Sequence, residues 1–134
     1  GKVAEAGECV KNNHVYLAPG RAHLVCHRDG NDVIIGHQSR YSASRYCPSV
    51  DAMLVSVARV YGPDGLALVF SGMGNDGLVG ARAFNASAAP VVVQDMQSSV
   101  VWGMPGAIVK EGLATAIMTP ADMTDMLSRI ATSS

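Results

Sequence analysis

Six residues near the middle of the chain could take part in chemistry: Gly72-Met73-Gly74-Asn75-Asp76-Gly77. They follow an apolar run at 66–70 and precede a helix-like segment at 77–88. The spacing, G-x-G-x-x-G, is typical of turns whose backbone N–H groups bind the pyrophosphate of a dinucleotide. Asp95 follows the next apolar run, where a dinucleotide-binding domain has the carboxylate that binds ribose. A cofactor loop is therefore the first hypothesis.

The position of Asp76 favours a different chemistry. It lies in the first turn of the expected helix, where the pyrophosphate would bind, and two like charges ~4 Å apart repel by ~4 kcal/mol at an effective dielectric of 20. A carboxylate at the end of a strand can instead orient a histidine as the acid of a Ser/His/Asp triad, beside backbone N–H groups that could bind an oxyanion. It could also do no more than complement the dipole of the helix. A dinucleotide site, a triad acid and a structural carboxylate all remain open.

Hydrophobic patterning predicts the elements that position this turn. Strands are expected at 14–18, 66–70, 91–94 and 115–119, and a β-hairpin at 22–27 and 32–37. Helices are expected at 49–61, 77–88, 98–102, 105–111 and 120–130. Strands that alternate with helices indicate an α/β fold, here a doubly wound, mostly parallel sheet with helices on both faces and an added antiparallel hairpin. The carboxyl ends of the strands are the expected place for a functional site.

Composition limits the classes of partner. The chain has 134 residues, which suits one domain, with 49% hydrophobic residues and a formal net charge of −1. The sequence has no basic patch of the kind that binds nucleic acids. It also has no run of about 18 apolar residues of the kind that inserts in a membrane. Cys9, Cys26 and Cys47 are expected to be free thiols in a reducing cytoplasm. His23 and His27 are four residues apart on an expected strand, which places them too far from each other to bind one metal ion. No metal site is therefore predicted. No cofactor is predicted either.

Several segments together resemble one known family. The segment SGMGNDGLVGARAF (71–84) resembles the G-M-G-x-D-G segment of chemotaxis protein-glutamate methylesterases of the CheB type. The match is colinear from about residue 3 to residue 130, and its other parts are HVYLAPGRAHL (14–24), CPSVDAMLVSVA (47–58) and VVVQDMQSSVVWGMPGAIVKEGLATAIMTP (91–120). The resemblance implies a methylesterase-like α/β domain over residues 1–134, as part of a single catalytic domain with no receiver domain in this chain.

The resemblance also implies a function. The family consists of serine hydrolases that act in chemotaxis signalling, releasing methanol from glutamate γ-methyl esters on methyl-accepting chemoreceptors in the cytoplasm. By its place in the motif, Asp76 corresponds to the triad acid and Met73 to the residue whose backbone N–H helps to form the oxyanion hole. The alternatives are a non-catalytic truncated relative that acts as an interaction module and, as an outsider, a dinucleotide-binding domain.

The resemblance carries one further expectation, about residues that the match does not contain. In the family the nucleophilic Ser and the catalytic His come before the part that matches this chain, on N-terminal strands expected to be absent here. A missing N-terminal segment or another chain is therefore the expected source of both. An unpaired sheet edge also predicts self-association of the isolated piece.

Overall fold

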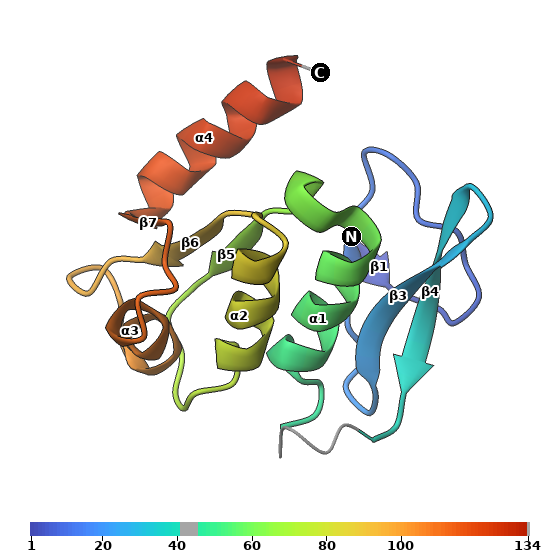
Figure 1. Cartoon of the computed structure of the whole chain (residues 1–134), viewed down its shortest axis with the longest axis horizontal. Coiled ribbons are helices and arrows are strands. Elements are labelled where there is room, and N and C mark those ends of the chain that lie inside the picture. The colour runs from blue at the N-terminus through green and yellow to red at the C-terminus, as the bar shows by residue number, and fades with distance from the viewer. Residues whose placement is uncertain (41–45, 134) are drawn as a thin grey trace.

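A parallel three-stranded sheet positions the candidate turn. The computed structural model describes residues 1–40 and 46–133. Its central strands are β5 (Ala67–Val69), β6 (Val91–Gln94) and β7 (Ala116–Met118), in the spatial order β5-β6-β7 (Figure 1). Every residue of β6 is buried, as expected for a middle strand covered on both faces. The strand predicted at 91–94 is confirmed with the same bounds, and those predicted at 66–70 and 115–119 are confirmed but shorter by one residue at each end.

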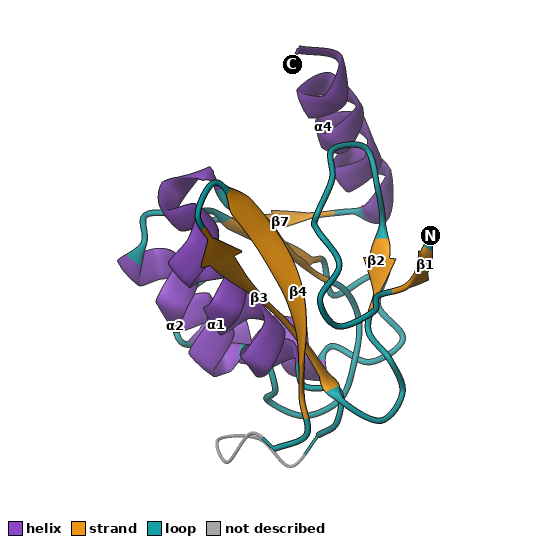
Figure 2. Ribbon diagram, turned by 90° about the vertical axis from the view of Figure 1, so that its right-hand side faces the viewer, coloured by secondary structure: helices purple, strands orange, loops and turns teal. Residues whose placement is uncertain are grey.

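Helices lie on both sides of this sheet. They are α1 (Val50–Tyr61), α2 (Leu78–Ala86), α3 (Gly103–Lys110) and α4 (Pro120–Ser133), and a short 3-10 turn, η1 (Gly62–Asp64), follows α1. Figure 2 shows α1 and α2 on the side opposite α4. The predicted doubly wound α/β fold is confirmed in these features.

The hairpin is formed by β3 (His23–Asp29) and β4 (Asp32–Gln38). It packs against α1, so that α1 lies between the hairpin and α2 (Figure 1). Because α1 is covered on two sides, side chains on more than one of its faces are buried, including Ala52, Leu54 and Ala58. A second, parallel pair consists of β1 (Lys2–Val3) and β2 (Tyr16–Leu17). The strand predicted at 14–18 is therefore reduced to two residues.

Close contact between α1 and α2 depends on Gly80. A Cβ on Gly80 would lie 2.5 Å from Cβ of Leu54, so only glycine permits this approach. The core beneath is apolar and includes Phe84, Val91, Val93 and Ile108, each 0% exposed. The two helices are therefore held at a fixed distance, and their amino-terminal ends lie together beside the candidate turn.

Apolar side chains also remain exposed on other elements. Val3 and Leu17 on β1 and β2, Ile117 on β7, and Leu127 and Ile130 on α4 are each 43–55% exposed. In α4 the apolar side chain that is fully buried is Met123, which is 1% exposed. Self-association stays a prediction.

The helix predicted at 98–102 does not form, and that prediction is wrong. The segment after β6 is a turn, in which the Ser98 hydroxyl donates to the Asp95 carboxylate and the Ser99 hydroxyl donates to the Asp95 carbonyl. Short hydroxyl and carboxylate side chains offer the backbone local bonds that compete with helix formation. Ser98 and Ser99 therefore stabilise a turn and not a helix.

Candidate functional site

The Gly-rich segment 71–77 forms the turn between β5 and α2. Gly74 has φ +83° and Gly77 has φ +112°, both in the region that favours glycine. A side chain on Gly74 would also collide with the Tyr46 hydroxyl. The glycine pattern therefore serves a sharp change of direction at the carboxyl end of β5.

The turn is fixed from one side by the segment that follows β6. Gly72 N–H donates to the Val101 carbonyl at 2.9 Å, and Met104 N–H donates to the Gly72 carbonyl at 3.0 Å. The buried Gln94 side chain accepts the Ser71 N–H at 2.8 Å through Oε1. Gln94 was interpreted only as part of a strand, although a polar residue that closes an apolar run was the available signal for this role.

Asp76 points across to the amino terminus of α1. Its side chain is 6% exposed. Oδ1 accepts the Ser49 hydroxyl at 2.9 Å and the Asp51 N–H at 3.2 Å, and Oδ2 accepts the Val50 N–H at 2.7 Å. Asp76 thus binds free N–H groups and the positive dipole end of α1, not of its own helix. A carboxylate offers about four lone-pair sites, which leaves room for one further donor such as an imidazole N–H.

Asp51 makes the reciprocal contact. It is the second residue of α1 and is 3% exposed, and its Oδ1 accepts the N–H groups of Gly77 at 2.8 Å and Gly80 at 2.9 Å at the start of α2. Burial raises the pKa of Asp51, the Gly80 N–H opposes that rise, and the negative charge of Asp76 adds to it. Each helix is therefore capped by a carboxylate from the other side of the contact.

Ser49 connects this pair of carboxylates to the hairpin. It is the N-cap of α1, where its Oγ accepts the Ala52 N–H at 3.3 Å while its hydroxyl donates to Asp76. Its own N–H donates to Nδ1 of His23 at 2.9 Å. His23 is 3% exposed, so Nδ1 acts as an acceptor inside the protein. The helix was predicted to start at residue 49, and Ser49 is its N-cap, but the bond from Ser49 to Asp76 was not predicted.

We expect Ser49→Ala to lower the free energy of unfolding by about 1–2 kcal/mol. The change removes the cap of α1 and leaves Asp76 with one donor fewer. Urea denaturation monitored by circular dichroism measures the loss. Ser39→Ala, at an exposed serine just after β4, is the control and should change stability by less than about 0.5 kcal/mol. Equal effects of the two changes would contradict the role assigned to Ser49.

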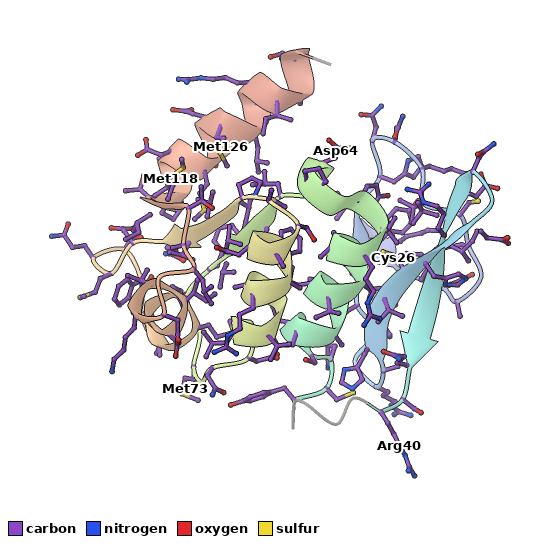
Figure 3. All side chains as sticks on the ribbon, viewed as in Figure 1. Cys26, Arg40, Asp64, Met73, Met118 and Met126 are labelled. Atoms are coloured by element: carbon purple, nitrogen blue, oxygen red, sulfur yellow. The ribbon has the colours of Figure 1, made fainter. Side chains whose placement is uncertain are left out.

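Met73 lies at the outer edge of the turn. Its side chain is 74% exposed and stands at one end of the molecule, away from Asp64, Met118 and Met126 at the other end (Figure 3). No residue in the described ranges 1–40 and 46–133 accepts the Met73 backbone N–H. This N–H lies at the carboxyl end of β5.

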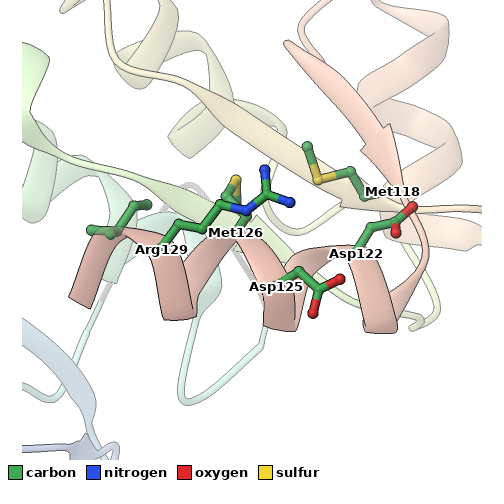
Figure 4. Close-up of a pocket in the computed structure, with 6 residues that line it drawn as sticks. Met118, Asp122, Asp125, Met126 and Arg129 are labelled. Atoms are coloured by element: carbon green, nitrogen blue, oxygen red, sulfur yellow. The ribbon is translucent and has the colours of Figure 1, made fainter. Parts of the chain in front are cut away.

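Other candidate features lie elsewhere. Asp95 takes part in the turn after β6, and its carboxylate accepts the Ser98 hydroxyl. A depression of about 380 Å³ lies between β7 and α4 and is lined by Met118, Asp122, Asp125, Met126, Arg129 and Ile130 (Figure 4).

Within the described residues, no group of three or more His, Cys, Asp or Glu side chains could hold a metal ion. Among those residues there is also no helix with the length and apolarity to cross a membrane.

Comparison with known proteins identifies the family of the chain. The family model described as CheB methylesterase matches residues 2–127. The chain belongs to the CheB methylesterase family. Its fold is that of the Thermotoga maritima CheB methylesterase catalytic domain, which it matches with a TM-score of 0.92 and 31% identity over 96% of this chain and 68% of that one.

Relatives of this CheB-family chain carry two activities in their names. The chain is 38% identical over 129 residues to a protein-glutamate methylesterase/protein-glutamine glutaminase of Paramagnetospirillum magneticum. It is 41% identical over 128 residues to one from Myxococcus xanthus. These matches cover 96% and 95% of the chain. The chain spans about a third of the length of these relatives, 34% and 35% respectively.

Proposed function

We propose that residues 1–134 are part of the catalytic domain of a cytoplasmic protein-glutamate methylesterase that acts on chemoreceptors. One observation carries the proposal. Asp76 and Met73 lie on a single turn at the carboxyl end of β5, with Asp76 buried against α1 and Met73 at the surface, in a chain of the CheB methylesterase family. Such an edge of a parallel sheet is where ligands bind in α/β folds.

In this proposal Asp76 orients the histidine of a Ser/His/Asp triad. Its open lone pair would accept an imidazole N–H and stabilise the imidazolium that forms when the histidine takes the proton of the serine. Serine Oγ attacks the ester carbonyl, and the Met73 N–H donates to the oxyanion of the tetrahedral intermediate. The imidazolium then protonates the departing methoxide oxygen, which leaves as methanol, and water hydrolyses the acyl-enzyme. The serine and the histidine are expected from a segment outside residues 1–134.

The names of the relatives favour a second substrate for the same site. They are called protein-glutamine glutaminases as well as methylesterases. A glutamine side-chain amide would undergo the same acyl transfer, with ammonia leaving in place of methanol. An interaction module without catalysis remains the competing function.

Product release tests the proposal. The full-length protein that contains these residues is mixed with a receptor peptide bearing glutamate methyl esters, and methanol is measured over time. A glutamine-containing peptide of the same sequence is assayed for ammonia. Methanol release that saturates with peptide concentration is the expected result. Binding of the peptide without either product would contradict the hydrolase and support the interaction module.

A further inference from the structure

Asp51 is not assigned a catalytic part by the motif, yet it is tied directly to the candidate turn. Its Oδ1 accepts two backbone N–H groups at the start of α2, from Gly77 at 2.8 Å and Gly80 at 2.9 Å. Gly77 is the N-cap of α2 and has no side chain with which to cap the helix. Asp51 therefore supplies from α1 the cap that α2 cannot make for itself.

The Gly77 N–H is part of the peptide group that joins Gly77 to Asp76. A hydrogen bond to this N–H fixes the orientation of that peptide plane, and thereby the direction in which the Asp76 side chain leaves the backbone. Asp76 in turn accepts the N–H of Asp51 at 3.2 Å. The two residues close a reciprocal loop in which each carboxylate holds the backbone of the other.

We propose that Asp51 is a positioning residue for Asp76 in the hydrolysis reaction. This inference rests on the proposed function. Asp51 touches neither substrate nor reacting atoms, and acts by holding the Asp76–Gly77 peptide and the start of α2. Side chains that orient a catalytic group have large effects on rate, because a displacement of about 1 Å can reduce it about 100-fold.

A purely structural cap would behave differently. If Asp51 only stabilised α2, its loss would lower the melting temperature and leave the turnover of folded molecules unchanged. Both N–H groups bind the same oxygen, Oδ1. Asparagine keeps a carbonyl oxygen that can accept both bonds, while alanine keeps none. Asp51→Asn therefore removes the negative charge and keeps the hydrogen bonds, whereas Asp51→Ala removes both.

The experiment measures kcat and KM for methanol release by the full-length protein. Asp51→Ala should lower kcat about 10-fold to 100-fold with KM changed less than about twofold, since the lost interaction acts on the reacting geometry. Asp51→Asn should restore kcat to within about threefold of the unchanged protein. The control is Asn85→Ala, which removes two hydrogen bonds at the other end of α2, to the carbonyls of Ala81 and Leu113, and should leave kcat unchanged.

Two results would overturn the proposal. One is a folded Asp51→Ala protein with unchanged kcat, and the other is an Asp51→Asn protein as impaired as Asp51→Ala. If Asp51→Ala does not fold, Asp51→Asn decides the matter through amide hydrogen exchange at Gly77 and Gly80, which should stay protected. Loss of that protection in a folded Asp51→Asn protein would count against the proposal.

A structural measurement separates failure of this inference from failure of the proposed function. An unchanged protein that releases no methanol would refute the proposed function alone. Positioning is then judged by the carbon-13 shift of the Asp76 carboxyl group. That shift should move in Asp51→Ala and stay in place in Asn85→Ala. An unmoved Asp76 signal in folded Asp51→Ala would refute positioning whatever the activity.

Discussion

Replacement of Asp76 by asparagine is expected to lower kcat for methanol release by about 10⁴-fold. Loss of the triad acid in serine hydrolases has an effect of this size, because an amide no longer holds the histidine in the required tautomer or stabilises the imidazolium. The steady-state rate of the full-length protein, measured with saturating methylated receptor peptide, gives the effect directly. A fall in kcat without a matching rise in KM is the expected pattern.

Asp76→Asn should also reduce stability, by about 1–3 kcal/mol. The amide nitrogen that replaces one carboxylate oxygen cannot accept a hydrogen bond, so a donor at the start of α1 loses its partner. The matched control is Asp64→Asn, the same chemical change at an exposed residue of η1. Figure 3 shows Asp64 at the opposite end of the molecule from Met73. If Asp76→Asn retained full activity, Asp76 would be a structural carboxylate and not a triad acid.

Gly103→Ala is expected to have the second-largest effect on activity, about 100-fold in kcat. A Cβ on Gly103 would lie 2.7 Å from the Gly72 carbonyl oxygen, 2.9 Å from Gly74 N and 3.0 Å from Met73 Cα. All three are backbone atoms, so no flexible side chain can move aside. The added methyl group must displace the turn that carries the proposed oxyanion donor, and misplacement of about 1 Å is enough for such a loss.

The sign of the stability change tests this mechanism. Gly103 begins α3, and in a helix alanine is favoured over glycine by about 1 kcal/mol. We nevertheless expect Gly103→Ala to destabilise the protein by about 1–3 kcal/mol, because the overpacking outweighs the helix preference. Gly20→Ala is the control, since a Cβ there meets nothing within 4 Å. A stabilised, fully active Gly103→Ala protein would contradict this mechanism, because it would show that the turn accommodates the methyl group without loss of activity.

Much of the fold could be predicted because its signals are local. The continuous apolar run of β6 and the turn residues Gly30 and Asn31 of the hairpin depend on neighbouring residues in the chain. The Ser49 cap of α1 is also local, because donor and acceptor are three residues apart. The extra helix predicted at 98–102 failed because Gln94 and Asp95 provided competing side-chain bonds.

The sequence by itself determined that Asp76 follows a buried strand in a Gly-rich turn, and its motif placed the chain in a family. It could not determine what Asp76 binds, because Asp51 is 25 residues away in the chain and Ser49 is 27. Only the packing of α1 on α2, made close by Gly80, brings the two helix starts together. Carboxylates then cap the opposite helices, since free N–H groups at a helix start donate to any acceptor that packing brings within reach.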